Sequence, residues 1–182
     1  MQNVSQHRVV GAAGDPRVGS VALHGAASDE VVAGARRALD EAGTRGVLQY
    51  LNAATRYRFT GLYRVDPPLL KNICLFDREN PTIPCSGDVS MLDETYCCIV
   101  AQSGEQFFTL DARSDVRLSP RGVRNGVISY AGVPLTHAGA VVGTLCHFDL
   151  RPRLSWPHDV AAMEAVAPLL VPAVVQVSAV GP

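Results

Sequence analysis

Two alternating runs of apolar residues, separated by a short turn, limit the fold of this chain most strongly. The runs cover residues 128–136 and 140–150, with residues 137–139 between them. Successive side chains of a strand point to opposite faces, so Val133 in the first run and Leu145 in the second fall on one apolar face. The pattern predicts two paired antiparallel strands.

The N-terminal half contains a helical pair and a second hairpin. Apolar spacing predicts helices over residues 29–42 and 45–55, with Gly43 ending the first. Residues 58–65 alternate in the same way as a strand, and a second apolar run covers 69–76. The Asp-Pro-Pro sequence between these runs predicts a tight connection and antiparallel pairing.

The remaining segments complete the order of elements. We expect a helix over residues 89–101, a short strand over 106–110, a long basic connection over 111–127 and a last helix over 157–177. This order predicts an α+β fold, with helices gathered on one antiparallel sheet. Residues 1–27 lack sustained periodicity and are predicted to form a flexible N-terminal tail. A single domain over residues 28–178 is expected to follow.

Composition excludes several classes of protein. A chain of 182 residues can bury one full core, and its net charge of −1 argues against a dedicated nucleic-acid binder. The most apolar stretch, residues 160–175, is interrupted by Glu164, Pro168 and Pro172, so no membrane-spanning segment is expected. Without a signal-peptide pattern at the N-terminus, we predict a cytoplasmic protein.

The cysteines do not form a recognisable framework. They are five in number and lack a repeated C-x2-C spacing, so neither a full set of disulfides nor a zinc or other metal site is indicated. In a reducing compartment they are expected to be mostly free thiols.

Three segments resemble the family of bacterial GAF domains. Residues 128–153 read ISYAGVPLTHAGAVVGTLCHFDLRPR. They resemble the family's signature hairpin, in which a Y-x-G-V-P-L strand and a short turn precede G-T-L-C-x-x-D and an arginine. Residues 93–97 resemble its D-T-F-C helix, and residues 108–112 resemble its V-x-D-A strand. The order and spacing fit from about residue 28 to residue 177.

The resemblance implies the GAF fold, a central antiparallel sheet with the N- and C-terminal helices on one face and a ligand chamber on the other. Residues 77–101 and 111–127 would roof that chamber. It also implies a sensory domain that binds a small molecule, changes conformation and signals to a downstream protein. Terminal helices commonly pair in this family, which implies a homodimer. The start at Met1 favours a stand-alone sensor over a fragment of a larger one.

Aromatic and charged residues at the implied chamber are the first candidate ligands. Tyr96, Phe108 and Tyr130 stand where the family lines its chamber, although core packing explains them equally well. Arginines at 113, 117, 121 and 124 favour an anionic ligand such as a phosphate or carboxylate. The alternative is a solvated loop in which Asp111 and Asp115 pair with these arginines. The full set of candidate ligand-binding residues is Tyr96, Cys97, Phe108, Asp111, Arg117, Arg124, Tyr130 and His147.

Cofactor binding is left open by one histidine. His147 follows Cys146 in the last predicted strand, where it either packs in the core or serves as a pocket or haem ligand. Bilin-binding GAF domains carry a cysteine before the Y-x-G-V-P-L strand, but residues 111–127 contain none. A covalently bound bilin is therefore not expected.

The thiols leave a redox function open. Asp93, one turn before Cys97, is expected to raise the pKa of that thiol, and Cys98 is expected to pack in the core. Cys85, in the loop over residues 77–87, is the best candidate for a reactive redox thiol. Free methionine sulfoxide reductases on this fold carry a G-R-G-V-C-G segment, whereas residues 121–124 read RGVR. No catalytic residue is predicted, and the alternatives are a haem- or thiol-based redox protein and a ligand-free dimerisation module.

Overall fold

One antiparallel sheet organises the part of the chain described by the computed structural model, residues 16–83, 87–118, 122–153 and 157–175. The sheet has six strands in the order β3-β2-β1-β6-β5-β4. The strands are β1 (Phe59–Asp66), β2 (Leu69–Asp77), β3 (Val89–Met91), β4 (Phe107–Thr109), β5 (Ser129–His137) and β6 (Ala140–Asp149). The helices are α1 (Pro16–Ala53), α2 (Cys97–Ser103) and α3 (Pro157–Val175), with 3-10 turns at η1 (Leu92–Glu94) and η2 (Val116–Leu118).

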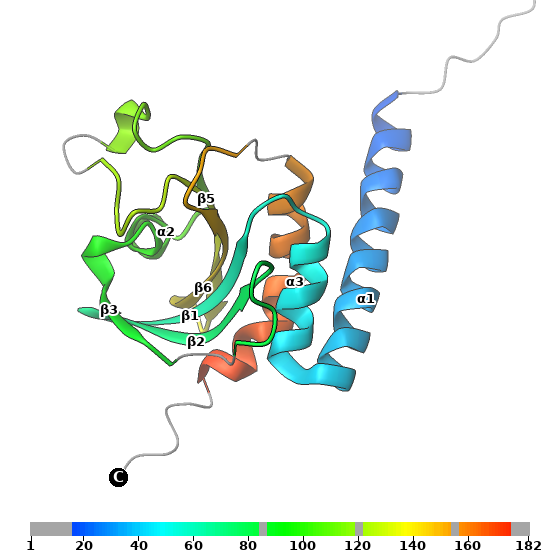
Figure 1. Cartoon of the computed structure of the whole chain (residues 1–182). Coiled ribbons are helices and arrows are strands. Elements are labelled where there is room, and N and C mark those ends of the chain that lie inside the picture. Colours follow the sequence, from blue (N-terminus) through cyan, green and yellow to red (C-terminus); the bar gives the residue numbers. More distant parts are fainter. Residues whose placement is uncertain (1–15, 84–86, 119–121, 154–156, 176–182) are drawn as a thin grey trace, which may run out of the picture.

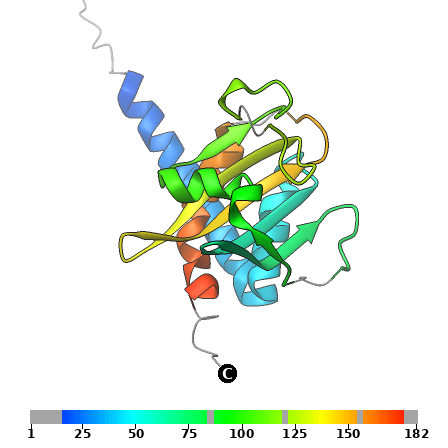
Figure 2. The ribbon, with the colours of Figure 1, turned by 90° about the vertical axis from the view of Figure 1, so that its left-hand side faces the viewer.

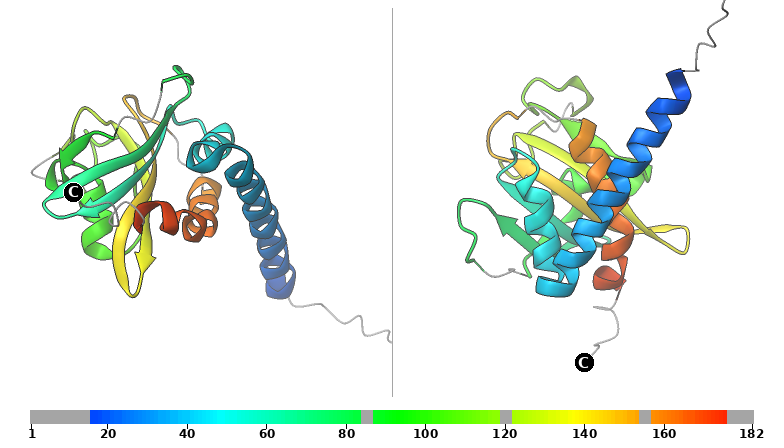
Figure 3. Two further views of the ribbon diagram at one scale, coloured as in Figure 1. Left: turned by 90° about the horizontal axis from the view of Figure 1, so that it is seen from below. Right: turned by 90° about the vertical axis from the view of Figure 1, so that its right-hand side faces the viewer.

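The helices divide between the two faces of the sheet. Helices α1 and α3 cover one face, while α2 and the connections around it lie over the other (Figure 1). Turning the molecule brings α2 in front of the sheet in one view (Figure 2) and α1 and α3 in front of it in another (Figure 3, right). The α+β order and the three-layer arrangement expected from the sequence are confirmed.

Both predicted hairpins are present, and they form the centre of the sheet. Strands β1 and β2 pair antiparallel, as do β5 and β6, and β6 also pairs with β1. At the β5–β6 turn, Ala138 has φ 50° and Gly139 has φ 80°. Two successive residues with positive φ match the twist of the flanking strands, which explains this two-residue turn.

Alternation along the central strands creates two separate cores. Leu62 and Leu145 point toward the helices and pack with Met163 and Leu170 of α3. Side chains at alternate positions, including Cys146, point to the other face. The largest buried residues of that second core are aromatic: Tyr96, Phe107 and Tyr130.

A bulge changes the phase of β2. The β1–β2 register shifts between Leu62 and Tyr63, which leaves Ile73 without a direct partner. On the C-terminal side of Ile73, Cys74 packs in the helix-facing core. On its N-terminal side, Leu70 packs in the second core. An extra residue in one strand has this effect because the side-chain period is two.

Helix α1 confirms one prediction and corrects another. Gly43 has φ 63° and ψ −157°, so the helix is interrupted where the sequence predicted its end. It begins at Pro16, however, so residues 16–27 are helical rather than part of an irregular tail. Proline suits the first helical position because its fixed φ is already helical. The first turns of α1 project away from the domain (Figure 3, left). Residues 1–15 lie outside the described part.

The predicted helix over residues 89–101 begins later than expected. Val89–Met91 forms the edge strand β3 and pairs with Leu69–Lys71 of β2. The turn η1 follows, and α2 begins only at Cys97. The apolar spacing of residues 89–101 is compatible with a helix, but Val89–Met91 form a strand because their backbone groups pair with the open edge of β2.

Helix α3 is the core helix of the domain. By length and hydropathy alone, His158–Val175 would qualify as a membrane span, contrary to the sequence expectation. Its residues Met163, Val166 and Leu170 are fully buried in the core beside the sheet. Burial inside the domain accounts for this apolar composition without a membrane.

Candidate functional site

A cavity of about 300 Å³ lies between the sheet and the segments that cover its second face. Strands β1, β2 and β6 provide the floor, α2 and the turn before it provide part of the roof, and residues 124–127 complete it. Its lining includes Phe59, Tyr63, Leu75, Tyr96, Cys97, Arg124, Tyr130, Cys146 and Phe148. Two further hollows, of about 320 and 380 Å³, lie beside Pro134 and Glu164, and none of the predicted site residues lines them.

A row of small residues crosses the floor. Cys146 of β6 pairs with Gly61 of β1 on one side and with Gly132 of β5 on the other. A Cβ atom added to Gly61 would lie 2.4 Å from the ring of Tyr63, and one added to Gly132 would lie 2.2 Å from the hydroxyl of Tyr130. The two glycines therefore give two tyrosine rings room to lie on the floor, one on each side of Cys146.

The roof is held by hydrogen bonds between Tyr96 and the connection before β5. The Tyr96 hydroxyl donates to the Val127 carbonyl at 3.1 Å and accepts from the Arg124 backbone N–H at 3.1 Å. The Arg124 Nη1 donates to the Thr95 carbonyl at 2.8 Å and to Cys98 Sγ at 2.7 Å. These bonds fix residues 124–127 to the segment that starts α2.

One polar atom of the roof has no protein partner. The Nε of Arg124 is buried and makes no hydrogen bond within the described residues. Buried donors are nearly always paired in folded proteins, so an unpaired one in a cavity wall indicates a place for a ligand or an ordered water. The guanidinium carbon lies 5.7 Å from the centre of the Tyr96 ring.

Two thiols meet where roof and floor approach each other. Cys97, the first residue of α2, and Cys146 of β6 are both buried and both line the cavity. The Cys97 Sγ lies 3.5 Å from the Tyr130 hydroxyl, and that hydroxyl lies over Gly132, the strand partner of Cys146. The nearby Cys146 thiol is the main cause that lowers the pKa of Cys97 to about 7, whereas burial raises the pKa of Cys146. The expectation that Asp93 raises the Cys97 pKa is wrong, because the thiol faces the sheet and its partners there dominate.

Burial also determines the state of the tyrosines. It raises the pKa values of Tyr63 and Tyr130 well above the ordinary value of a phenol. Both hydroxyls are therefore neutral hydrogen-bond donors at physiological pH. The polar groups that line the cavity include the Tyr63 and Tyr130 hydroxyls, the Cys97 and Cys146 thiols and Arg124, whose Nε is unpaired.

Half of the residues predicted from the sequence line this cavity. Tyr96, Cys97, Arg124 and Tyr130 do so. Phe108 does not, because its side chain is 44% exposed on the outer side of β4. Its neighbour Phe107 points inward instead, with its ring centre 6.4 Å from that of Tyr96. Of the two adjacent phenylalanines, Phe107 therefore packs beside Tyr96, whereas the predicted Phe108 does not.

Asp111 and Arg117 also lie outside the cavity. Asp111 forms an ion pair with Arg113 at 2.6 Å, and Asp115 forms one with Arg117 at 2.6 Å. In each pair the arginine hydrogen bond lowers the pKa of the aspartate. The Arg117 Nη2 also donates to a backbone carbonyl of β4. Neither Arg113 nor Arg117 lines the cavity, and each pairs with a local aspartate as the alternative of a solvated loop expects. Arg121 lies outside the described residues.

His147 belongs to the opposite face of the sheet. Its Nδ1 lies 2.7 Å from the hydroxyl oxygen of Thr60, and its ring stacks on Tyr57 at 5.9 Å. Burial lowers its pKa to about 3. The interpretation as a pocket or haem ligand is therefore wrong, and the packing alternative is confirmed. Alternation dictates this, since Cys146 and Phe148 on either side face the cavity.

Three aromatic residues of the cavity are absent from the predicted set. Phe59 and Phe148 stack at 4.8 Å on the floor, and Tyr63 lies on the same face of β1 as Phe59. The alternation of residues 58–65 places Phe59 and Tyr63 together, so the sequence carries a signal for these two.

The cysteines differ in their state. Cys97, Cys98 and Cys146 are free thiols, as expected. Cys74, in the helix-facing core, is disulfide-bonded, so the expectation of free thiols is wrong for this residue. Cys85, the predicted reactive thiol, lies outside the described residues.

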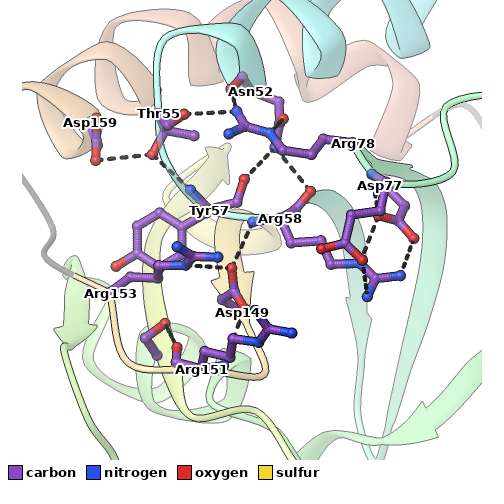
Figure 4. Close-up of polar contacts among 12 residues, drawn as sticks. Asn52, Thr55, Tyr57, Arg58, Asp77, Arg78, Asp149, Arg151, Arg153 and Asp159 are labelled. Carbon is purple, nitrogen blue, oxygen red and sulfur yellow. Dashed lines mark hydrogen bonds and ion pairs between the residues drawn. The ribbon is translucent and has the colours of Figure 1, made fainter.

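A polar network lies behind the floor, where β1 and β6 meet the helices (Figure 4). The carboxylate of Asp149 accepts hydrogen bonds from the Arg58 N–H, the Arg151 N–H and the Arg153 Nε, at 3.0, 3.1 and 2.7 Å. It therefore joins the end of β6 to the start of β1.

The same network reaches both helices of the outer layer. The Asn52 amide of α1 donates to the Thr60 hydroxyl at 2.8 Å. Close to it, the Thr55 hydroxyl donates to Asp159 of α3 at 3.1 Å. Arg78, after β2, donates to the side chain and backbone oxygens of Asn52 (Figure 4). The end of α1 is thus bonded to β1, and the beginning of α3 is bonded to the connection that leads from α1 into β1.

Comparisons with known proteins agree with this architecture. The family model described as GAF domain matches residues 26–174. The GAF domain of an Acinetobacter phosphoenolpyruvate-protein phosphotransferase is 17% identical, with a TM-score of 0.60 over 81% of this chain and 94% of that one. A comparison with curated protein sequences found no match.

Two further solved structures illustrate the range of the fold. Free methionine-R-sulfoxide reductase from Neisseria meningitidis, in complex with its substrate, has a TM-score of 0.61 at 17% identity and covers 96% of this chain and 100% of that one. The phycoerythrobilin-bound GAF domain of a cyanobacterial phytochrome has a TM-score of 0.58 at 17% identity, over 86% and 96% of the two chains. At such identities the likeness shows the fold alone. The family match, over most of the chain, shows that this protein belongs to the GAF domain family.

Proposed function

We propose that this domain is a sensor that binds a small, mainly apolar molecule with one polar group in the cavity. The observation that carries the proposal is the cavity itself, about 300 Å³ in volume, with aromatic walls and the unpaired Nε of Arg124. Ligand sites in proteins are typically concave and apolar with a few convergent polar groups. The GAF fold commonly houses such sites, which supports the assignment.

The wall chemistry supports a particular kind of ligand. The stacked rings of Phe59 and Phe148 offer a flat apolar floor. The Tyr63 and Tyr130 hydroxyls and the Arg124 Nε can donate hydrogen bonds, so an acceptor on the ligand, such as a carbonyl, carboxylate or ring nitrogen, would complement them. An anion remains compatible with one guanidinium, although not with the cluster of arginines that the sequence suggested.

The proposed signal passes through the sheet to the helices. Phe59 and Phe148 face the cavity, while their neighbours Thr60 and His147 face α1 and bond to it through Asn52. A ligand that moves the floor would shift this contact and change the balance between two arrangements of the helices. The surface that transmits the signal would be formed by α1 and α3. These helices would pair in a homodimer and contact a downstream signalling protein in the cytoplasm.

Detection of a bound molecule is the first test. Native mass spectrometry of the purified protein, before and after denaturation, is expected to reveal an added mass that is lost on unfolding. A ligand found in this way, or in a metabolite screen, should raise the midpoint of thermal unfolding. A protein without added mass that no metabolite stabilises would be a ligand-free module instead.

Two pairs of variants locate the site. Tyr130→Phe removes one hydroxyl from the cavity and should weaken ligand binding about three- to tenfold, which corresponds to one hydrogen bond. Tyr50→Phe makes the same change on α1 and should leave affinity unchanged. Leu75→Trp should fill the cavity and abolish binding, while Leu110→Trp, at an exposed position, should not. Equal affinities within either pair would contradict the proposed site.

A further inference from the structure

We propose that Cys97 and Cys146 form a reversible disulfide inside the cavity and make it a redox site that responds to hydroperoxides. This inference goes beyond ligand sensing, because the bond can form whether or not the cavity binds a metabolite. It assigns chemistry to the only two thiols that line the cavity among the described residues.

The geometry brings the two sulfurs together from different elements. Cys97 begins α2 in the roof, and Cys146 lies in β6, a central strand of the floor. Both thiols are free and line the cavity, and both lie beside one hydroxyl: that of Tyr130 is 3.5 Å from Cys97 Sγ and lies over Gly132, the strand partner of Cys146. A disulfide needs a sulfur–sulfur distance of about 2.0 Å, and each cysteine has one side-chain torsion with which to approach it. Rotation of these side chains, with a movement of α2 toward β6, would bring the two sulfurs together.

The third free thiol is arranged differently. Cys98 accepts a hydrogen bond from the Arg124 Nη1 at 2.7 Å and does not line the cavity. It also follows Cys97 directly in the chain, and neighbouring cysteines cannot bond to each other without distortion of the peptide between them. Cys98 is thus a matched control on the same helix.

The surroundings favour Cys97 as the attacking sulfur. The Tyr130 hydroxyl lies 3.5 Å from Cys97 Sγ, and the thiol of Cys146 lies in the same buried cluster and also favours the thiolate of Cys97. Both groups stabilise a thiolate, and the pKa of Cys97 is correspondingly lowered to about 7. Burial holds Cys146 in the protonated form, which suits the second partner of the reaction.

The reaction proceeds in two balanced steps. The Cys97 thiolate attacks the terminal oxygen of a hydroperoxide, the O–O bond breaks, and a sulfenic acid forms. The leaving alkoxide, or hydroxide from hydrogen peroxide, takes up the proton that the Cys97 thiol had released and departs as an alcohol or water. The Cys146 sulfur then attacks the sulfenic sulfur, the S–O bond breaks, and water leaves with the Cys146 proton. The two thiols lose two electrons in total, and the hydroperoxide gains them.

Closure of the bond would join the roof to the floor. The segment that begins α2 would then be covalently attached to the centre of the sheet. Because Tyr63 and Tyr130 flank Cys146, the disulfide would occupy the polar end of the cavity. The oxidised protein is therefore expected to bind a cavity ligand less well than the reduced protein.

The test is peptide mapping of the whole protein after oxidation. The reduced protein is treated with a few equivalents of hydrogen peroxide, denatured, alkylated and digested. We expect a cross-linked peptide pair that contains Cys97 and Cys146, at least tenfold more abundant than in the untreated sample and lost after treatment with dithiothreitol. Mapping by peptide separates this bond from the disulfide of Cys74.

Variants make the outcome decisive. Cys98→Ser should form the same cross-link, whereas Cys97→Ser and Cys146→Ser should not, with circular dichroism as the check that each variant is folded. Full alkylation of Cys97 and Cys146 after oxidation and unfolding would overturn the proposal, and so would a bond that uses Cys98. Ligand binding is measured on the reduced protein, so failure of either proposal can be recognised independently of the other.

Discussion

Replacement of His147 should change how the stability of this domain depends on pH. The Asn52 amide donates to the Thr60 hydroxyl, and this hydroxyl can donate in turn to the Nδ1 of His147, at 2.7 Å. With Nδ1 as the acceptor, protonation of that nitrogen would break the chain of hydrogen bonds. Burial, together with the positive charge of Arg78, lowers the pKa of the histidine to about 3.

The size of the effect follows from the two pKa values. An unfolded histidine has a pKa of about 6.5, so between this value and about 3 the unfolded chain binds more protons than the folded one. Stability must then fall as the pH is lowered through this interval. Between pH 7 and pH 5 the loss amounts to about 2 kcal/mol of the free energy of unfolding. Carboxylates such as Asp77, with a pKa of about 2, lose their contribution at lower pH.

The assay is urea unfolding followed by circular dichroism at pH 7, 6 and 5. His147→Asn cannot be protonated in this range, so it should lose about 2 kcal/mol less than the wild type between pH 7 and pH 5, although it will be less stable at every pH. His137→Asn, at the exposed β5–β6 turn, should behave as the wild type. If wild type and His147→Asn have the same pH dependence, the histidine is not held neutral and the assignment of the network is wrong.

Three further changes test other parts of the structure. Asp149→Asn should cost about 2–3 kcal/mol in urea unfolding, because a buried acceptor of charged and backbone donors is lost; Asp66→Asn, which breaks an exposed pair, should cost under about 1 kcal/mol. Gly143→Ala should lower stability by about 1–3 kcal/mol, because the new Cβ would lie 2.5 Å from a backbone oxygen of β1; an unchanged unfolding midpoint would refute that close approach. Tyr96→Phe should speed amide hydrogen exchange at Arg124, whose N–H loses its acceptor, and equal exchange would show that the roof is held by other contacts.

Local patterns were sufficient to predict the hairpins and the break at Gly43. Alternation over residues 128–136 depends only on the chain itself, since a strand with one buried face has to alternate. The strand over Val89–Met91 could not be found in this way, because its conformation depends on the edge of β2, which lies about twenty residues earlier. Short apolar runs are compatible with both helix and strand, and tertiary pairing decides between them.

The site was less predictable than the fold for a similar reason. Phe107 rather than Phe108 faces inward because β4 pairs in a register that places Phe107 opposite Gly132, which no local pattern specifies. The pairing of Arg113 and Arg117 is easier to predict, because it is local. Asp111 and Arg113 stand two positions apart in a D-x-R order, as do Asp115 and Arg117, and this spacing favours their ion pairs.

The thiol pair and the histidine network lie on opposite faces of the same strand. Cys146 lines the cavity together with Cys97, while His147, the next residue, faces α1 through Thr60. A shift of the β6 backbone moves Cys146 and His147 together, because consecutive residues share a rigid peptide plane. Any movement of β6 that closes a disulfide or admits a ligand must therefore be accommodated by the hydrogen bond between His147 and Thr60. The floor of the cavity is thus also the surface on which the outer helices rest, and the paired strands β1 and β6 join the cavity to α1 through Thr60 and His147.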